Sequence, residues 1–282
     1  RSFEDIFSLY AVGSNENWYD YPFLTTMFRQ AGYEVFFLSN QFVMNPSESF
    51  SAFIEDIFIN DKEISELQFS HRNENIHPYD MGLLDDYQKM KKLSSAHNLW
   101  IFHTMGLHAK FSERYPSEWN KFTLADYHRP DLNEEMLEEL ADYDNAILYN
   151  DYFLNAVINT FKDKEAVIVF LSDHGERVFD NSTEFGRNLT WNVNDIKQQF
   201  EIPFWFYFTE AYREKHPEVV ETAISVKNKR YMTDIISHTL IHLAGIQSKY
   251  YCPEYDILNP AYNEQRIRTI RNQRDFDAIV SQ

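Results

Sequence analysis

The sequence contains a single cysteine, few glycines and no long apolar run. Cys252 alone cannot form a disulfide within the chain, so cysteine usage does not indicate a cellular compartment. The count of 7 glycines argues against fibrous or repetitive architectures. No stretch approaches the roughly 20 apolar residues that a helix needs to cross a bilayer. We therefore expect a globular chain that is soluble by itself.

Positive charge is also scarce. The chain has 26 Lys and Arg against 44 Asp and Glu, which gives a formal net charge of -18. Because nucleic acid is bound by clustered Lys and Arg, we exclude it as a partner. Only residues 266–271 are locally basic, through Arg266, Arg268 and Arg271. Three arginines are too few for a polybasic patch, and we expect a solvated helix face there.

Aromatic residues, by contrast, are abundant. They make up 17% of the 282 residues, with 24 Phe and 18 Tyr, and such a chain can bury a substantial core. Short continuous runs of aromatic and β-branched residues predict strands that are covered on both faces. These runs are 35–38, 99–102, 166–171 and 204–208.

Helical patterns lie between these strands. Helices are predicted over 22–32, which begins at a Pro and ends at a Gly, and over about 133–161 and 233–244. Residues 180–199 are polar and irregular, which predicts a long loop after a strand. The alternation of strands and helices favours an α/β fold with a mostly parallel sheet, in which ligands gather at the carboxyl ends of the strands.

The most informative motif follows the strand at 166–171. Asp173 and His174 stand together just after the strand ends, followed by Gly175. Carboxylate oxygen and neutral imidazole nitrogen are good zinc ligands, and we expect Gly175 to let the backbone turn tightly beneath the ion. The alternative is a polar strand end in which Asp173 caps a turn. The context favours a metal site for phosphate-ester or sulfate-ester chemistry.

A second pair of polar side chains follows the strand at 99–102. His103 and His108 lie at its carboxyl end, where they could bind a second metal, neutralise a phosphate or act as general acids. Ordinary loop or core histidines are the alternative. His238 and His242 have helical i, i+4 spacing but lack the Glu of the metalloprotease helix, so we expect them to pack.

Taken with their neighbours, these motifs resemble those of the bacterial phosphoethanolamine transferases of lipid A and lipopolysaccharide, members of the alkaline phosphatase and sulfatase superfamily. The His-Thr-x-Gly-Ser-His segment is matched by His103 to His108, with a trailing Arg114-Tyr115-Pro116, and the metal motif by Leu171 to Glu176. Further similar segments follow the order of the family along nearly the whole chain: 30–33, 38–41, 143–152, 201–204, 232–234 and 243–246.

The resemblance implies an alkaline-phosphatase-like α/β/α sandwich and one catalytic domain over residues 1–282. It further implies Asp173 and His174 as Zn²⁺ ligands, with His103 and His108 near the substrate phosphate or a second zinc. Where relatives carry another His, this sequence has Arg187, which could hold a phosphate but cannot bind zinc. Leu107, Ala109 and Lys110 replace the usual Ser, Gly and Pro of the family.

The family's nucleophile is a threonine on the first strand-and-helix unit of the domain. Matching Ile6-Phe7-Ser8 to the stretch that follows that threonine places it just before Arg1. We therefore expect an N-terminally truncated domain that is inactive by itself. The intact protein is expected to transfer phosphoethanolamine from a phospholipid to lipid A or a lipopolysaccharide core sugar through a covalent threonine intermediate.

The resemblance also implies a location, which is the periplasmic side of a bacterial inner membrane, anchored by helices upstream of this chain. A sulfatase of the same fold is the nearest alternative, but its Cys-x-Pro-Ser-Arg-like motif is not in this sequence. A phosphoglycerol transferase is another relative, from which the segment 103–116 differs. The alternative of another class is a binding module that has kept the fold and lost catalysis.

Overall fold

A computed structural model describes residues 6–14, 16–41, 61–180, 182–187, 191–270 and 274–281. They form two compact units. Unit 1 consists of Arg1–Ile76, Asp86–His103 and His216–Ser281, and unit 2 of His77–Asp85 and Thr104–Lys215. The single catalytic domain over 1–282 stays a prediction. No helix within the described ranges is long and apolar enough to span a membrane.

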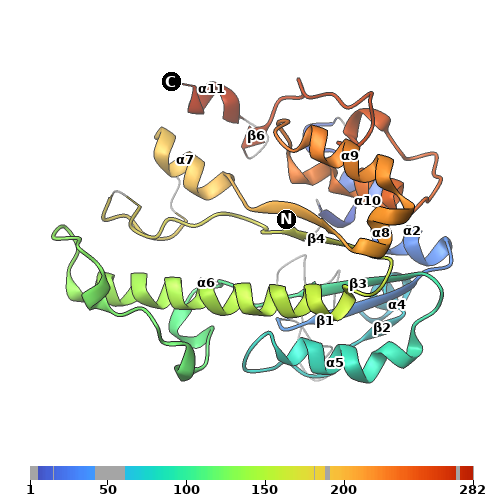
Figure 1. Cartoon of the computed structure of the whole chain (residues 1–282). Helices are drawn as coiled ribbons and strands as arrows, with labels where there is room; N and C mark the ends of the chain where they lie inside the picture. Colours follow the sequence, from blue (N-terminus) through green and yellow to red (C-terminus); the bar gives the residue numbers. More distant parts are fainter. Residues whose placement is uncertain are drawn as a thin grey trace. The chain divides into compact units, whose positions relative to one another are not determined.

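Unit 1 is built on a parallel sheet with the strand order β2-β1-β3 (Figure 1). Strand β1 (Glu34–Ser39) pairs along its whole length with β3 (Asn98–His103), and β2 (His71–Arg72) pairs with the other edge of β1. Two of the predicted strands are thereby confirmed. The apolar residues of β1, from Val35 to Leu38, have no exposed surface.

Helices cover both faces of this sheet. On one face, Val35 and Phe37 of β1 pack with residues of α2 (Leu24–Gln30) and with Ile241 of α10 (Ile236–Leu243). On the other face, Phe36 stacks on Trp100 with ring centroids 3.7 Å apart, and Tyr87 of α5 (Gly82–Met90) packs edge-on against Trp100. This layering confirms the α/β class.

The predicted helices of unit 1 are present with small changes. Helix α2 is followed by Gly32, whose φ of +88° is a left-handed conformation that glycine adopts without strain. The predicted helix over 233–244 begins as the 3₁₀ turn η6 (Thr233–Ile235) and continues as α10. The other elements of unit 1 are η1 (Trp18–Asp20), α4 (Lys62–Gln68), η2 (Lys91–Leu93), α9 (Pro217–Val226), η7 (Pro253–Tyr255), β6 (Thr269–Ile270), β7 (Arg274–Asp275) and α11 (Phe276–Val280).

The predicted helix face at 266–271 is wrong for the described residues of that stretch. Arg266 lies in a bend, where its Nη1 donates to Oδ1 of the buried Asp234 at 2.9 Å. Arg268 pairs with Asp277. These arginines neutralise carboxylates instead of lining a solvated helix, and Arg271 lies outside the described residues.

Unit 2 is dominated by α6 (Glu134–Phe161), the long green helix of Figure 1. It begins where the sequence predicts, because Oδ1 of Asn133 accepts a hydrogen bond from the amide of Met136 at 2.9 Å and caps the helix. Its apolar side packs on residues of the flanking loops, including Phe111 and Phe179. Three 3₁₀ turns precede it: η3 (Phe111–Glu113), η4 (Ser117–Trp119) and η5 (Leu124–Asp126).

The remaining two predicted strands are confirmed in unit 2. Strands β4 (Val167–Leu171) and β5 (Phe204–Phe208) pair antiparallel, whereas the three strands of the β2-β1-β3 sheet in unit 1 are parallel. Every residue of β3 and β4 is only partly buried. These strands are thus less buried than β1, and each has one hydrogen-bonded neighbour among the described strands.

The predicted loop over 180–199 is wrong in its second half, which forms α7 (Val193–Phe200). Asn192 caps this helix, since its Oδ1 accepts from the amide of Asp195 at 2.9 Å. Ile196 is fully buried and anchors the helix to unit 2. Val193, Ile196 and Phe200 have the helical spacing i, i+3 and i+7, a signal that the loop prediction overlooked among the polar residues. Helix α8 (Glu210–Lys215) follows β5.

Candidate functional site

The Asp173–His174 pair stands immediately after β4, where the sequence predicts it. Oδ2 of Asp173 lies 3.5 Å from Nε2 of His174. Nδ1 of His174 is 3.0 Å from the carbonyl oxygen of Gly175, and since a carbonyl can only accept, Nδ1 carries the proton. In the neutral ring, the lone pair is then on Nε2, which faces the carboxylate. An outward imidazole nitrogen with its other nitrogen held in this way is the arrangement that metal-binding histidines use.

The side chains of Asp173 and His174 are of the kinds that bind zinc. The side chains of Asp173 and His174 are 60% and 31% exposed, so both are open to an ion. No group of three or more His, Cys, Asp or Glu side chains placed to hold a metal occurs within the described residues. Catalytic zinc takes three protein ligands and structural zinc four. Zinc ligation by Asp173 and His174 stays a prediction, and the pair could provide two of these ligands.

Gly175 serves a different purpose from the tight turn that was predicted. Its amide donates to the carbonyl oxygen of Gln199 at 3.0 Å, which joins the motif to the end of α7. A Cβ at position 175 would lie 2.0 Å from the carbonyl oxygen of Gln198. Its φ is not among the left-handed values of the described glycines. Close approach of two backbone segments, rather than a special turn, requires glycine here.

Arg177 was missed by the sequence reasoning, although it directly follows the motif. Its side chain is 1% exposed, with Nη1 3.1 Å from Oδ2 of Asp195 in α7. Its Nε donates to the carbonyl oxygen of Gly186 at 2.9 Å. This guanidinium ties the metal motif, the loop after it and α7 together. The sequence signal for this buried role is that Arg177 directly precedes the apolar Val178 and Phe179.

Arg187 lies on the same loop as predicted and faces the motif. Its Nε is 3.8 Å from Oε2 of Glu176, two residues after His174, and its side chain is 53% exposed. A guanidinium so placed can reach a phosphoryl oxygen near the metal motif, because its fork of donors suits phosphate geometry. Phosphate binding by Arg187 stays a prediction.

His108 ends a tight turn after β3. The amide of His108 donates to the carbonyl oxygen of Met105 at 3.1 Å, and Gly106 between them has a φ of +54°. The imidazole of His108 is exposed. Lys110, where the family usually has proline, has a φ of +67°. Proline cannot adopt this conformation.

His103 ends β3 in unit 1. Its Nδ1 lies 3.0 Å from Oγ of the fully buried Ser39, which is the last residue of β1. Its ring stacks against Phe37 at 5.7 Å. Ser39 therefore orients the imidazole, a role that the sequence did not reveal although Ser39 lies in a family-like segment. The other predicted site residues belong to unit 2, and the convergence of the two strand ends stays a prediction.

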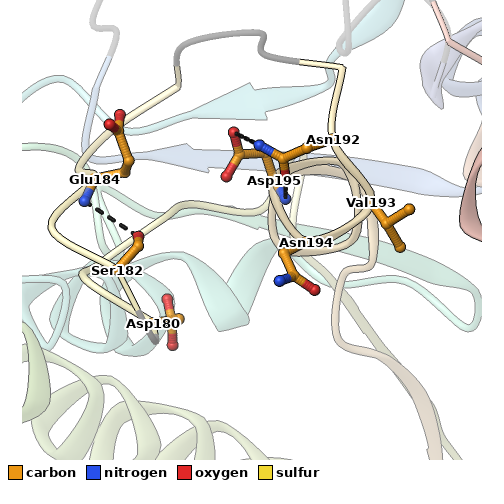
Figure 2. Close-up of a pocket in the computed structure, with 7 residues that line it drawn as sticks. All are labelled: Asp180, Ser182, Glu184, Asn192, Val193, Asn194 and Asp195. Carbon is orange, nitrogen blue, oxygen red and sulfur yellow. Dashed lines mark hydrogen bonds between the residues drawn. The ribbon is translucent and has the colours of Figure 1, made fainter.

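A hollow of about 320 Å³ lies in unit 2 beside the loop that follows the metal motif (Figure 2). Carboxylates and amides dominate its wall, which consists of Asp180, Ser182, Glu184, Asn192, Val193, Asn194 and Asp195. Figure 2 shows Asn192 bonded to Asp195 at the start of α7. An acidic wall disfavours phosphate. Neither Asp173 nor His174 lines this hollow.

Comparison with known proteins identifies one family. The family model named Sulfatase matches residues 5–246. Phosphoethanolamine transferase EptC of Escherichia coli O18:K1:H7 is 32% identical over 265 residues, which cover 92% of this chain and 44% of that protein. The chain thus spans less than half the length of this relative.

Solved structures agree with the sequence comparison. The C-terminal periplasmic domain of Escherichia coli EptC is 27% identical, with a TM-score of 0.79, and the match covers 98% of this chain and 77% of that one. The same domain in complex with Zn gives 25% identity and a TM-score of 0.77 over the same shares of both chains. The expected alkaline-phosphatase-like fold is confirmed by these neighbours.

Proposed function

Because this chain belongs to the sulfatase family, we propose that it forms the catalytic domain of a zinc-dependent phosphoethanolamine transferase. The observation that carries the proposal is the Asp173–His174 pair after β4, in which Nε2 keeps its lone pair and faces the carboxylate. The similarity to EptC over 92% of the chain supports the group that is transferred. The relative solved with Zn supports the metal.

The proposed reaction has two steps. The hydroxyl oxygen of a threonine of the intact protein attacks the phosphorus of a phosphoethanolamine lipid, and the diacylglycerol oxygen leaves with the proton of that hydroxyl. An acceptor hydroxyl then attacks the phosphorus of this phosphoethanolamine-threonine, and its proton passes to the threonine oxygen, which restores the threonine. Zinc held by Asp173 and His174 would supply Lewis acidity at the phosphoryl group.

The other residues act on the substrate directly. The exposed imidazole of His108 can donate a proton to a leaving oxygen or a hydrogen bond to the phosphoryl group. His103, with its Nδ1 beside Ser39, would serve the same purpose. Arg187 would neutralise phosphate charge. The donor is a phospholipid and the acceptor a lipopolysaccharide-type glycolipid, at the periplasmic face of an inner membrane.

The test removes one proposed ligand from the intact protein. Asp173→Ala should lose bound zinc, measured by elemental analysis, together with phosphoethanolamine transfer, measured by mass spectrometry of the acceptor lipid. Asp163→Ala is the matched control, because Asp163 is an exposed carboxylate in the turn after α6. It should keep both properties. Full transfer by the Asp173→Ala protein would overturn the assignment.

Assays of the wild-type protein distinguish a transferase from a sulfatase and from a binding module. Release of sulfate from a sulfate ester without transfer to a glycolipid would favour a sulfatase. Glycolipid binding without turnover, with zinc still bound, would favour a binding module.

A further inference from the structure

The turn that carries His108 is held by a carboxylate from another segment of unit 2. Oδ1 of Asp80 accepts a hydrogen bond from the amide of Met105 at 2.9 Å, and Oδ2 accepts one from the amide of Gly106 at 2.8 Å. Asp80 lies in the turn just before α5 and is partly buried. Both oxygens of one side chain therefore hold two successive amides of the loop.

These two amides belong to the turn that ends at His108. The turn closes with the hydrogen bond from the amide of His108 to the carbonyl oxygen of Met105, and the positive φ of Gly106 sets its direction. Fixing the first two residues of a closed turn also fixes where its fourth residue points. The position of the His108 imidazole therefore depends on Asp80.

Leu107 within the turn packs against the apolar cluster that includes Phe111, and one further hydrogen bond to this loop is weaker than those to Asp80. Nη2 of Arg114 donates to the carbonyl oxygen of Ala109 at 3.4 Å, which is long for such a bond. The bonds to Asp80 are short, and an ionised acceptor makes them stronger than neutral ones. Removing the carboxylate would leave both amides without this partner and free the turn to move.

We propose that Asp80 is a positioning residue for the transfer reaction, acting through His108 rather than on the substrate. The proposal rests on the proposed function, in which His108 faces the phosphoryl group or the leaving oxygen. A displacement of about 1 Å in a reacting group can lower a rate by about a hundredfold. A carboxylate that holds the turn from outside the loop is well suited to prevent such a displacement.

The test compares Asp80→Ala and Asp80→Asn in the intact protein, with phosphatidylethanolamine as the donor. The alanine variant should lower kcat by about tenfold to a hundredfold and change KM much less, because the turn misplaces His108. The asparagine variant, with one acceptor oxygen, should lose less. Asp85→Asn is the matched control, since Asp85 is exposed in the first turn of α5, and its kcat should not change. All variants should keep the zinc content of the wild type.

A double-mutant cycle separates positioning from a general structural role. When His108 is already replaced by alanine, adding Asp80→Ala should lower kcat no further. An equal loss in both backgrounds, or an unchanged kcat in the Asp80→Ala protein, would overturn the positioning role.

Hydrogen exchange at the amides of Met105 and Gly106 should accelerate in the Asp80→Ala variant, and unchanged exchange would contradict the geometry itself. If the alanine variant does not fold, the asparagine variant in the same cycle decides. Absence of transfer by the wild type would instead overturn the proposed function.

Discussion

At the scale of single residues, the imidazole of His242 is coupled to a buried carboxylate. Its Nδ1 lies 2.5 Å from Oδ2 of Asp256, which is fully buried and also accepts from the hydroxyl of Tyr251 at 2.7 Å. The hydrogen bond to Asp256 raises the pKa of His242, and burial only partly opposes it. Burial alone would raise the pKa of Asp256, but the hydrogen bonds from His242 and Tyr251 outweigh it and the pKa is lowered.

This pair predicts a pH-dependent part of the stability. Because the folded pKa of His242 is raised, its contribution is complete below the unfolded value of about 6.5 and is lost as the pH rises through the folded pKa. His242→Gln should therefore be destabilising by up to about 1 kcal/mol at pH 5.5, a figure limited by solvent screening, and by progressively less toward pH 9. Urea unfolding at the two pH values measures the difference. His97→Gln, at an exposed position, is the control. An equal effect of His242→Gln at both pH values would contradict the prediction.

His238 lies on the same helix, but its environment disfavours the charged imidazole. Its side chain is 1% exposed, and burial lowers its pKa to about 4. Its Nδ1 accepts from the amide of Cys252 at 3.1 Å, which fixes the neutral ring. The expectation that this histidine packs is confirmed. His238 and His242 are spaced i, i+4 on one helix, yet they have different roles because their burial and their hydrogen-bond partners differ.

At the scale of elements, the buried side-chain amide of Asn145 in α6 holds the loop that precedes this helix. Oδ1 of Asn145 accepts from the amides of Lys121 and Phe122, both at 2.8 Å. Its Nδ2 donates to the carbonyl oxygen of Phe122 at 2.9 Å and to Oδ1 of Asn120 at 3.0 Å. Asn145 has no exposed surface. Every hydrogen-bonding position of this amide is therefore used to hold residues 120–122.

We predict that Asn145→Ala lowers the free energy of unfolding by about 2–3 kcal/mol, because it leaves buried loop amides without partners. Asn159→Ala on the same helix should change it by no more than about 0.5 kcal/mol, since Asn159 is exposed. Chemical denaturation of the two variants provides the comparison. Similar losses for both would show that helix propensity, rather than the buried amide, is responsible.

At the scale of the whole molecule, a buried ion pair connects parts of unit 1 that are far apart in the sequence. Arg266 Nη1 donates to Oδ1 of Asp234, and Arg266 Nη2 donates to the carbonyl oxygen of Val12, each at 2.9 Å. The amide of Val12 donates to Oδ2 of Asp234 at 2.7 Å. The segment around Val12 is thus fixed between two charged groups of the C-terminal third.

Replacing one partner of this ion pair should lower the unfolding free energy more than replacing both partners. Asp234→Asn is expected to lower the unfolding free energy by about 3–5 kcal/mol, because Arg266 is left as a largely buried charge without its partner. Adding Arg266→Met should restore part of the loss. Denaturation of the single and double variants tests this. A double variant less stable than the single one would show that the desolvated charge is not the cause.

Much of the fold follows from local patterns in the sequence. The apolar runs predict the four main strands, and Asn133 marks the start of α6, because buried strands and capped helices need particular residues at adjacent positions. The Asp173–His174 motif is likewise local, since two neighbouring residues at a strand end must lie close together. Scarce positive charge is a property of composition, and the absence of long apolar runs is a property of the residue order.

The tertiary structure decided what lies between segments that are distant in the sequence. Ser39 beside His103, Asp80 beneath the turn of His108 and the carbonyl oxygen of Gln198 against Gly175 have no local signature. The same holds for Arg266, whose charge predicts a solvated surface until Asp234 is placed beside it. Sequence patterns fix which groups are available for chemistry, whereas the packing of distant segments fixes their orientation and their partners.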